Sequence, residues 1–348
     1  MDHVEQRPMY PVPIAFTLAL ALLASCAPHV TAPDRIYVSN ERGDSVVAFD
    51  PAAGKVVQEV RPGRRPRGMA LSPDGTRLYV AVSGSPIGGP GVDERALAAA
   101  DHAADGIAVV TLSSGAVERV LPAGTDPETF ALSADGRMLF VSNEDQGSVS
   151  AVATDGGRVP LRAKVGEEPE GIAVTPDGAR LFVACEASDH VAMLDARTLR
   201  PIRTIPLQGR PRGALMSADG GFVYVTVELA GKLAVLSAAD GSVVRVIDLA
   251  RGDRTLKPMG MVEAPGGHLF VTTGRAGAVL EVDVTAGTIV RRIAHVGARP
   301  WGIALSRDGR WLVTANGSSN DVSVIDREAG KVVRKVHAGF GPWGAASR

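Results

Sequence analysis

One short phrase recurs along the whole chain: Pro-x-Gly, an apolar run, and then a turn of the Pro-Asp-Gly type. It is clearest over Pro169–Gly178, which reads Pro-Glu-Gly-Ile-Ala-Val-Thr-Pro-Asp-Gly. Four of the six successive spacings between its prolines are 42 residues, and the others are 61 and 47: Pro66, Pro127, Pro169, Pro211, Pro258, Pro300 and Pro342. A period of about 40–45 residues is typical of a four-stranded propeller blade. The repeat therefore predicts one repetitive domain rather than two ordinary ones.

Each repeat divides into four short apolar runs separated by turn formers. In the fourth repeat we expect strands over Gly171–Thr175, Leu181–Cys185, His190–Asp195 and Pro201–Ile205. Runs such as Asp321–Asp326 alternate in polarity, the pattern of a sheet with two different faces. We therefore predict an all-β, seven-bladed propeller with four antiparallel strands in each blade.

The two ends of the repeat array complement each other. Residues 35–60 supply three strands without a Pro-x-Gly strand in front of them, and Gly341–Arg348 supplies only that missing strand. We expect the C-terminal strand to complete blade one, which closes the ring and leaves no exposed sheet edge at the seam.

Two repeats depart from the pattern. The second carries about 20 extra residues, Gly84–Asp105, in which Asp93–Ala104 could form a short helix, and the third has Thr129 where the motif has glycine.

The N-terminus has the pattern of a secretory signal. The apolar run Ile14–Ala24 is too short to cross a bilayer, and it ends in Leu23-Ala24-Ser25-Cys26, which resembles a bacterial lipobox. We expect a signal peptide over 1–25, a lipidated Cys26, a tether over 26–34 and the propeller over 35–348. A plain secretory signal with an incidental cysteine is the alternative. The expected location is the bacterial cell envelope, lipid-anchored and either periplasmic or surface-exposed.

The charge balance excludes one class of partner. The chain has 37 Lys and Arg residues against 38 Asp and Glu residues, so nothing favours nucleic acid. If Cys26 is acylated, Cys185 is left alone and no intramolecular disulfide can form. We expect a monomer held at the membrane by its lipid.

Three further stretches carry a family resemblance: Tyr37–Glu41, Pro73–Val80 and Asn320–Asp326. They resemble the YVTN-repeat propellers of bacteria and archaea over Ile36–Arg348. The ending Thr314–Asp326 followed by Gly341–Gly344 is similar to a subgroup associated with pyrroloquinoline-quinone-dependent catabolism. The resemblance implies a seven-bladed secreted or surface-attached protein, mostly without known catalysis and without agreed catalytic residues.

The candidate site follows from strand order, because the first strand of a blade is innermost. The middle residue of Pro-x-Gly should border the central channel, and it varies between cation, anion and aromatic: Trp343, Arg67, Glu128, Glu170, Arg212, Met259 and Trp301. The same end gathers residues that follow the second strands, with the insertion as a possible flap: Glu41, Glu144, Glu186 and Glu228. We expect an ionic half and an aromatic half at one mouth. The alternative is that these residues form solvated Arg–Glu pairs across a water-filled channel, which contribute little to stability.

Other chemistry has weaker support. Of the seven histidines only His102 and His190 could approach the mouth, and a pair without a third ligand does not make a metal site. The Ser-Pro-Asp-Gly repeats are turns without an accompanying base. We therefore expect neither a metal nor a cofactor.

These observations favour a non-catalytic protein that binds a small amphiphilic ligand or a periplasmic protein partner at the mouth. It could be accessory to quinoprotein metabolism. The enzyme alternative is a lactonase-type hydrolase, which would use a base and an electrophile among Glu128, Glu170, Arg67 and Arg212. A third possibility is an envelope scaffold without a ligand.

Overall fold

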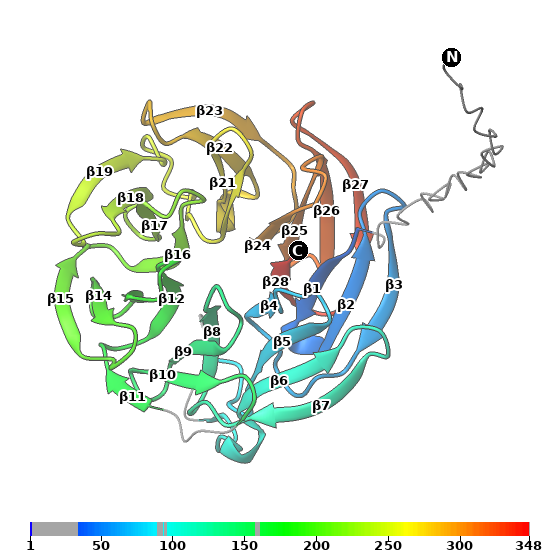
Figure 1. Cartoon of the computed structure of the whole chain (residues 1–348). Helices are drawn as coiled ribbons and strands as arrows, with labels where there is room; N and C mark the ends of the chain where they lie inside the picture. Colours follow the sequence, from blue (N-terminus) through cyan, green and yellow to red (C-terminus); the bar gives the residue numbers. More distant parts are fainter. Residues whose placement is uncertain (2–33, 89–92, 94–95, 157–160, 348) are drawn as a thin grey trace. The chain divides into compact units, whose positions relative to one another are not determined.

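The computed structural model describes Met1 and residues 34–347, except for 89–92, 94–95 and 157–160. All of the predicted signal but Met1, together with Cys26 and all of the tether but Asp34, lies outside the described residues. The described chain forms seven four-stranded antiparallel sheets arranged as a ring (Figure 1). The predicted seven-bladed propeller is confirmed.

The strands run from the channel outwards in each blade. Blades 1 to 3 are β28 (Pro342–Ala346), β1 (Ile36–Asn40), β2 (Ser45–Asp50), β3 (Lys55–Val60); β4 (Met69–Leu71), β5 (Arg77–Val82), β6 (Gly106–Thr111), β7 (Ala116–Leu121); β8 (Pro127–Leu132), β9 (Met138–Asn143), β10 (Ser148–Ala153), β11 (Leu161–Lys164). Blades 4 and 5 are β12 (Pro169–Val174), β13 (Arg180–Cys185), β14 (His190–Asp195), β15 (Pro201–Pro206); β16 (Pro211–Met216), β17 (Phe222–Val227), β18 (Lys232–Ser237), β19 (Val243–Asp248). Blades 6 and 7 are β20 (Met261–Ala264), β21 (His268–Thr272), β22 (Val279–Asp283), β23 (Thr288–Ile293); β24 (Pro300–Leu305), β25 (Trp311–Asn316), β26 (Asp321–Asp326), β27 (Lys331–His337).

Blade 1 is closed by strands from both ends of the chain. β28 pairs with β1 in antiparallel register, with Val38 opposite Ala345 and Asn40 opposite Pro342. The Asn40 side chain adds a hydrogen bond across the seam, because its Nδ2 donates to the Ala338 carbonyl at 2.7 Å. The predicted closure is confirmed.

The Pro-Asp-Gly turns owe their shape to the aspartate. Asp74 Oδ1 accepts from the Ser72 hydroxyl at 2.6 Å and from the Thr76 amide at 2.9 Å, an arrangement typical of Asx turns. Gly75 takes the left-handed conformation with φ of +68°, which costs glycine nothing.

The Pro-x-Gly motif forms a β-bulge in most blades. Pro169 lies opposite Cys185 and Ile172 opposite Val183, so two residues of β12 face one residue of β13. A bulge turns a side chain away from the regular alternation, here toward the channel. The glycine is needed because a Cβ on Gly171 would lie 2.2 Å from the Arg212 carbonyl oxygen of the next blade.

Buried hydroxyl groups fasten neighbouring blades at the same level. In four blades a second-strand hydroxyl donates to the carbonyl of the next blade's Pro-x-Gly middle residue, at 2.7–2.9 Å: Ser39 to Arg67, Ser142 to Glu170, Thr226 to Met259 and Thr272 to Trp301. The backbone that carries the candidate site residues is therefore held rigidly.

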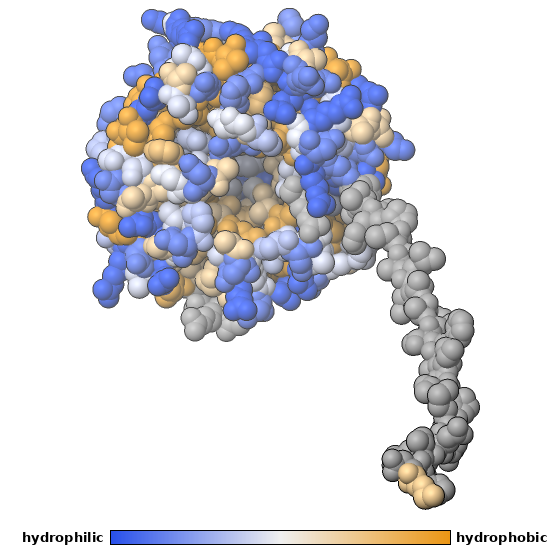
Figure 2. Space-filling view, turned by 45° about the horizontal axis from the view of Figure 1, so that its top comes forward, coloured by the Kyte–Doolittle hydropathy of each residue, from blue (hydrophilic) through white to orange (hydrophobic). Residues whose placement is uncertain are grey.

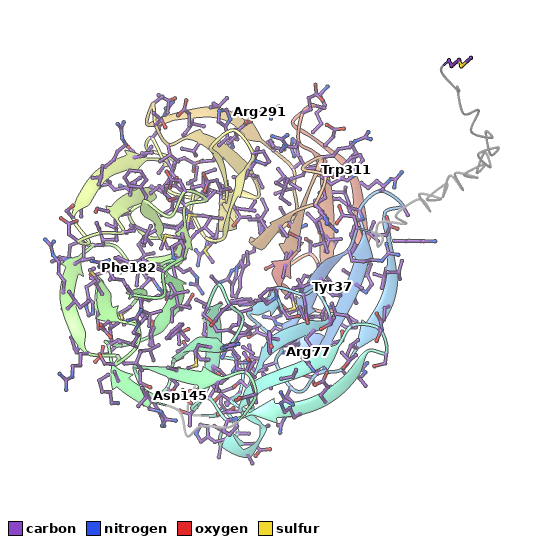
Figure 3. All side chains as sticks on the ribbon, in the orientation of Figure 1. Tyr37, Arg77, Asp145, Phe182, Arg291 and Trp311 are labelled. Atoms are coloured by element: carbon purple, nitrogen blue, oxygen red, sulfur yellow. The ribbon has the colours of Figure 1, made fainter. Side chains whose placement is uncertain are left out.

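The core lies between neighbouring sheets. Phe182, which is labelled in Figure 3, and Met193 of blade 4 pack against Val223 and Val225 of blade 5. All four side chains are buried. Because aliphatic residues fill these interfaces, few aromatic residues are needed.

The insertion of blade 2 is anchored by Asp105. Its carboxylate accepts from the Gly84 amide at 2.7 Å, the Asp126 amide at 3.0 Å and the His102 ring at 2.8 Å. Of the short helix expected over Asp93–Ala104, the described residues show only 3-10 turns, one at Ala96, whose amide donates to the Asp93 carbonyl at 3.0 Å, and one at η3 (His102–Ala104). Between them the Asp101 amide bonds back to the Gly84 carbonyl at 3.1 Å. Two further short turns are η1 (Glu41–Gly43) and η4 (Gly274–Ala276). Within the described ranges no helix has the length and apolar character needed to cross a membrane.

Candidate binding site at the channel mouth

A cavity of about 1180 Å³ opens at the end of the channel where the links between blades lie. Nine of the predicted site residues line it: Arg67, Glu128, Glu170, Arg212, Trp301, Trp343, Glu41, Glu144 and Glu228. Figure 2 shows the ring hollowed at its centre, with hydrophobic side chains in part of the wall. The repeat geometry has thus gathered residues from all over the chain into one mouth.

Two predicted site residues, Met259 and Glu186, do not line this cavity. Met259 is apolar and 4% exposed, and it lines a second chamber of the channel rather than the mouth. Glu186 is 2% exposed and buried against two arginines, so its carboxylate is already occupied.

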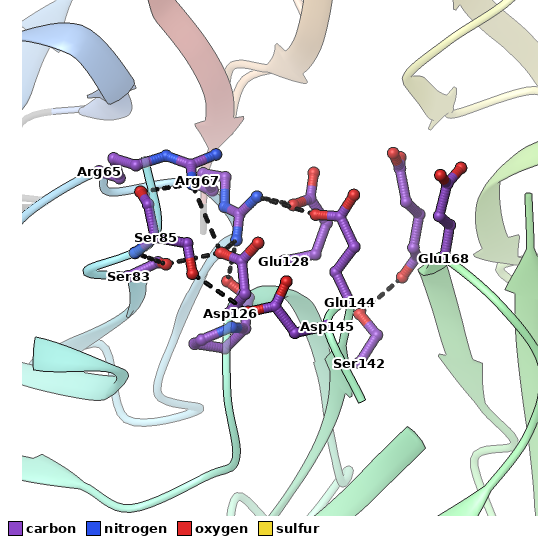
Figure 4. A network of polar contacts seen from close by, with 12 residues as sticks. Arg65, Arg67, Ser83, Ser85, Asp126, Glu128, Ser142, Glu144, Asp145 and Glu168 are labelled. Atoms are coloured by element: carbon purple, nitrogen blue, oxygen red, sulfur yellow. Dashed lines mark hydrogen bonds and ion pairs between the residues drawn. The ribbon is translucent and has the colours of Figure 1, made fainter. Parts of the chain in front are cut away.

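The first ion-pair cluster joins blades 2 and 3 (Figure 4). The Arg67 guanidinium forms ion pairs with Asp126 and Glu128 and reaches Glu144 at 3.3 Å. Arg65 pairs with Glu41 of blade 1 at 3.0 Å and approaches Asp126 at 3.6 Å. The Arg67 side chain is only 2% exposed, so the alternative of solvated pairs is wrong here.

The second cluster joins blades 4 and 5 in a similar way. Arg212 pairs with Glu170 at 2.7 Å, Glu186 at 2.9 Å and Glu228 at 3.1 Å. Arg210 pairs with Glu186 and lies 3.7 Å from Glu228. Each cluster therefore holds more carboxylates than arginines, and together they form the ionic half of the mouth.

Burial changes the acidity of these groups. Burial raises the pKa of Glu128 to about 8, even though Arg67 acts to lower it. Burial also raises the pKa of Glu170 well above its ordinary value against the opposing effect of Arg212, and Glu186 raises it further. Both central carboxyl groups therefore hold a proton more tightly than an exposed glutamate does.

The aromatic half lies on blades 7 and 1. The rings of Trp301 and Trp343 meet edge to face, with centroids 5.7 Å apart. The Arg299 guanidinium lies 4.9 Å from the Trp301 ring centroid, and the Arg212 guanidinium lies 5.2 Å from it. The Trp301 indole Nε1 is buried and finds no hydrogen-bond partner among the described residues. Such a donor is available to an acceptor on a ligand.

Beside the tryptophans the cavity wall is basic. Five cations line it, and none forms an ion pair with a described carboxylate: Arg42, Arg254, Lys257, Arg275 and Arg299. The pKa of Arg299 is lowered by burial and then by the nearby charge of Arg212, and Arg275 and Arg42 add to this effect, although Glu228 acts to raise it. The net effect disfavours the charged guanidinium, so an anion beside Arg299 would be favoured.

Sequence reasoning missed the residue that precedes each proline. In five blades this residue is charged and has a left-handed backbone, with φ between +43° and +69°: Arg65, Asp126, Glu168, Arg210 and Arg299. An L-residue pays about 1–2 kcal/mol in this conformation. The available signal was the charge that recurs directly before proline in the repeat.

The described residues contain no group of three or more His, Cys, Asp or Glu side chains that could hold a metal ion. His190 is bound to the Val165 and Ser188 carbonyls, and His102 to Asp105. Cys185 is buried, and burial raises the pKa of its thiol to about 12.

A family model described as outer membrane protein assembly factor BamB matches residues 42–336. No curated protein sequence matches the chain. Similar solved structures include the periplasmic gluconolactonase of Pseudomonas aeruginosa, with 24% identity, a TM-score of 0.70, and coverage of 90% of this chain and 98% of that one.

Two others resemble the chain over a similar span. The Kuenenia stuttgartiensis hydrazine synthase has 21% identity and a TM-score of 0.67, covering 83% of this chain and 91% of that one. A Bacteroides uniformis protein assigned as a 6-phosphogluconolactonase has 17% identity and a TM-score of 0.71, covering 91% of this chain and 100% of that one. At these identities the likeness shows the fold alone.

Proposed function

The chain belongs to the family described as outer membrane protein assembly factor BamB, and on this fold we propose that the channel mouth binds a small anion with an apolar body. The observation that carries the proposal is the division of charge around one cavity. The carboxylates of the mouth are held by four arginines in two clusters: Arg65, Arg67, Arg210 and Arg212. The cations of the opposite wall lie beside two tryptophans and form no ion pair with a described carboxylate.

Arg299 would bind the anionic group of the ligand. It is the cation closest to the tryptophan wall, and it has no carboxylate partner among the described residues. A charge-assisted contact contributes about 1.5–3 kcal/mol, and aromatic contact about 0.5–1.5 kcal/mol beyond area burial. With the cost of ordering the ligand, these terms favour micromolar rather than tighter binding.

Calorimetric titration tests the proposal with 2-naphthoate and its neutral counterpart 2-naphthamide. We expect 2-naphthoate to bind at least tenfold more tightly, and Arg299→Gln to remove that preference. Arg197→Gln is the matched control, since Arg197 is exposed in a turn between β14 and β15 and does not line the cavity. Equal binding of 2-naphthoate to wild type and Arg299→Gln would overturn the proposal.

A second candidate is hydrolysis of a lactone, which the raised pKa values of Glu128 and Glu170 support. In such a reaction water would attack the lactone carbonyl carbon and give up a proton to an ionised carboxylate, while a neutral carboxyl group would donate a proton to the ring oxygen as its bond to that carbon breaks. The hydroxy-acid product would be an anion suited to the basic wall. Two of the similar structures are lactonases by name, which adds to this candidate. A pH-stat assay with glucono-δ-lactone tests it. Lactone opening should be faster with wild type than with Glu170→Gln, and rates equal to the uncatalysed rate would exclude it for this substrate.

The finer assignment remains a proposal as well. The YVTN-like repeats and the lipobox support an envelope protein of the YVTN type, lipid-anchored and accessory to quinoprotein metabolism. Co-purification with a periplasmic protein from its own host, lost in Arg299→Gln, would instead indicate a protein partner at the mouth. If the mouth binds neither a small ligand nor a protein partner, an envelope scaffold without a ligand is the function that remains.

A further inference from the structure

A second chamber lies deeper in the channel. It has a volume of about 340 Å³ and meets the mouth cavity at four residues that line both: Glu170, Arg212, Trp301 and Trp343. The two spaces are thus adjacent, and the two tryptophans and the Glu170–Arg212 ion pair lie at their boundary. A volume of this size lies within the range of small-molecule sites, which begins at about 300 Å³.

The wall of the chamber differs from that of the mouth. Apart from Glu170 and Arg212 at the boundary, none of the described residues that line it is charged. Its larger side chains are apolar and come from the innermost strands and their links: Met69, Phe130, Ile172, Leu215, Met259 and Met261. Methionines adapt their shape to different apolar ligands, and three of these six residues are methionine.

We propose that the ligand of the mouth is an amphiphilic carboxylic acid whose hydrocarbon tail occupies this chamber. The inference rests on the proposed function, since it places the carboxylate at Arg299. The tail passes along Trp301 and Trp343, which line both spaces. The Trp301 Nε1, buried and without a described partner, is available to the carboxylate or to an oxygen near it.

The physical reason is that charged side chains line the mouth, whereas mostly apolar side chains line the chamber. A compact polar anion would satisfy the cations but would leave the apolar chamber facing water. A hydrocarbon tail removes that surface from water, and each buried CH₂ strengthens binding about fourfold. An anion without a tail can gain nothing from the chamber.

A homologous series tests this: calorimetric titration with hexanoate, octanoate and decanoate, below micelle formation and at constant ionic strength. For wild type we expect about a fifteenfold gain in affinity for every two carbons until the chamber is full. Met69→Gln and Met261→Gln keep the size of the side chain but make the wall polar, so the gain with chain length should shrink. Met216→Gln is the matched control, because Met216 lies on β16 next to Leu215 and does not line the chamber.

The outcomes separate the two proposals. If Arg299→Gln weakens every acid equally while affinity in wild type does not rise with chain length, the mouth proposal stands and the chamber proposal fails. The chamber proposal also fails if both chamber variants keep the wild-type dependence on chain length. If neither 2-naphthoate nor any fatty acid binds, both fail. Should a variant not fold, as judged by its melting temperature, the wild-type series decides.

Discussion

Arg299 and Arg210 occupy the same place in the repeat, directly before the proline, and both have a left-handed backbone with φ of +57° and +69°. Their surroundings differ. Arg210 forms ion pairs with Glu168, Glu186 and Glu228, whereas Arg299 pairs with no described carboxylate and lies over Trp301. The strained backbone at Arg210 thus presents a side chain to partners within the protein, whereas the strained backbone at Arg299 presents one without a described carboxylate partner. Strained residues cluster at ligand-binding sites, so this difference is expected if Arg299 binds a ligand.

Glycine at these two positions should have opposite effects on stability. Arg299→Gly relieves a left-handed conformation that costs about 1–2 kcal/mol, partly offset by the greater freedom of glycine in the unfolded chain. We expect the free energy of unfolding to stay level or rise by up to about 1 kcal/mol. Arg210→Gly relieves the same strain, but it leaves the buried Glu186 carboxylate with Arg212 as its remaining described cation, and it should destabilise the protein by about 1–3 kcal/mol. Urea unfolding measures both, and an Arg299→Gly variant as unstable as Arg210→Gly would contradict the assignment of strain.

The seam of blade 1 supports a second prediction. Deleting Gly341–Arg348 removes β28, so that β1 loses its inner partner and the Asn40–Pro342 end of the ladder. The exposed edge and lost contacts should cost several kcal/mol, a large part of the roughly 5–15 kcal/mol that stabilises a typical domain. The control is deletion of only Ser347 and Arg348, which lie beyond β28. A melting temperature within a few degrees of wild type for the longer deletion would contradict this role of the seam.

The lipobox supports a third prediction, on residues outside the described part of the structure. In a bacterial host the wild-type protein should partition into the detergent phase and carry a lipid-modified N-terminus at Cys26. Cys26→Ser should stay in the aqueous phase, and Cys185→Ser should behave as wild type. An intact mass showing an unmodified N-terminus would instead indicate a plain secretory signal.

The fold could be predicted because its signal is a period. The spacing of Pro169, Pro211 and their counterparts fixes one blade per repeat, and the strands of blade 4 begin and end within about two residues of the predicted positions. The same period predicted which side chains border the channel, since the middle residue of Pro-x-Gly sits on a bulge in blade after blade.

The charge pattern of the mouth was harder to predict from the sequence than the fold. The repeat places Arg67 and Arg212 near glutamates, but it does not show that Asp126 also pairs with Arg67 and Glu186 with Arg212. These ion pairs depend on side-chain directions that are set in part by residues with a left-handed backbone directly before proline. Residues in that position usually have an extended backbone instead. The sequence alone therefore does not single out Arg299 as the cation without a described carboxylate partner.

Glu128 supports the last prediction, on pH. Burial raises its pKa to about 8, whereas a glutamate in an unfolded chain titrates near ~4.3. The folded protein keeps a proton that the unfolded chain has lost, so the contribution is complete below pH ~4.3 and is lost as the pH rises through about 8. Between these values the group should lower the free energy of unfolding by up to ~1.4 kcal/mol per pH unit. Glu128→Gln cannot titrate, so its stability relative to wild type should increase from pH 5 to pH 8 in urea unfolding. Glu118→Gln, at a carboxylate whose pKa is lowered first by Thr111 and also by Arg77, should show a constant difference over that range. A constant difference for Glu128→Gln as well would mean that Glu128 is ionised throughout.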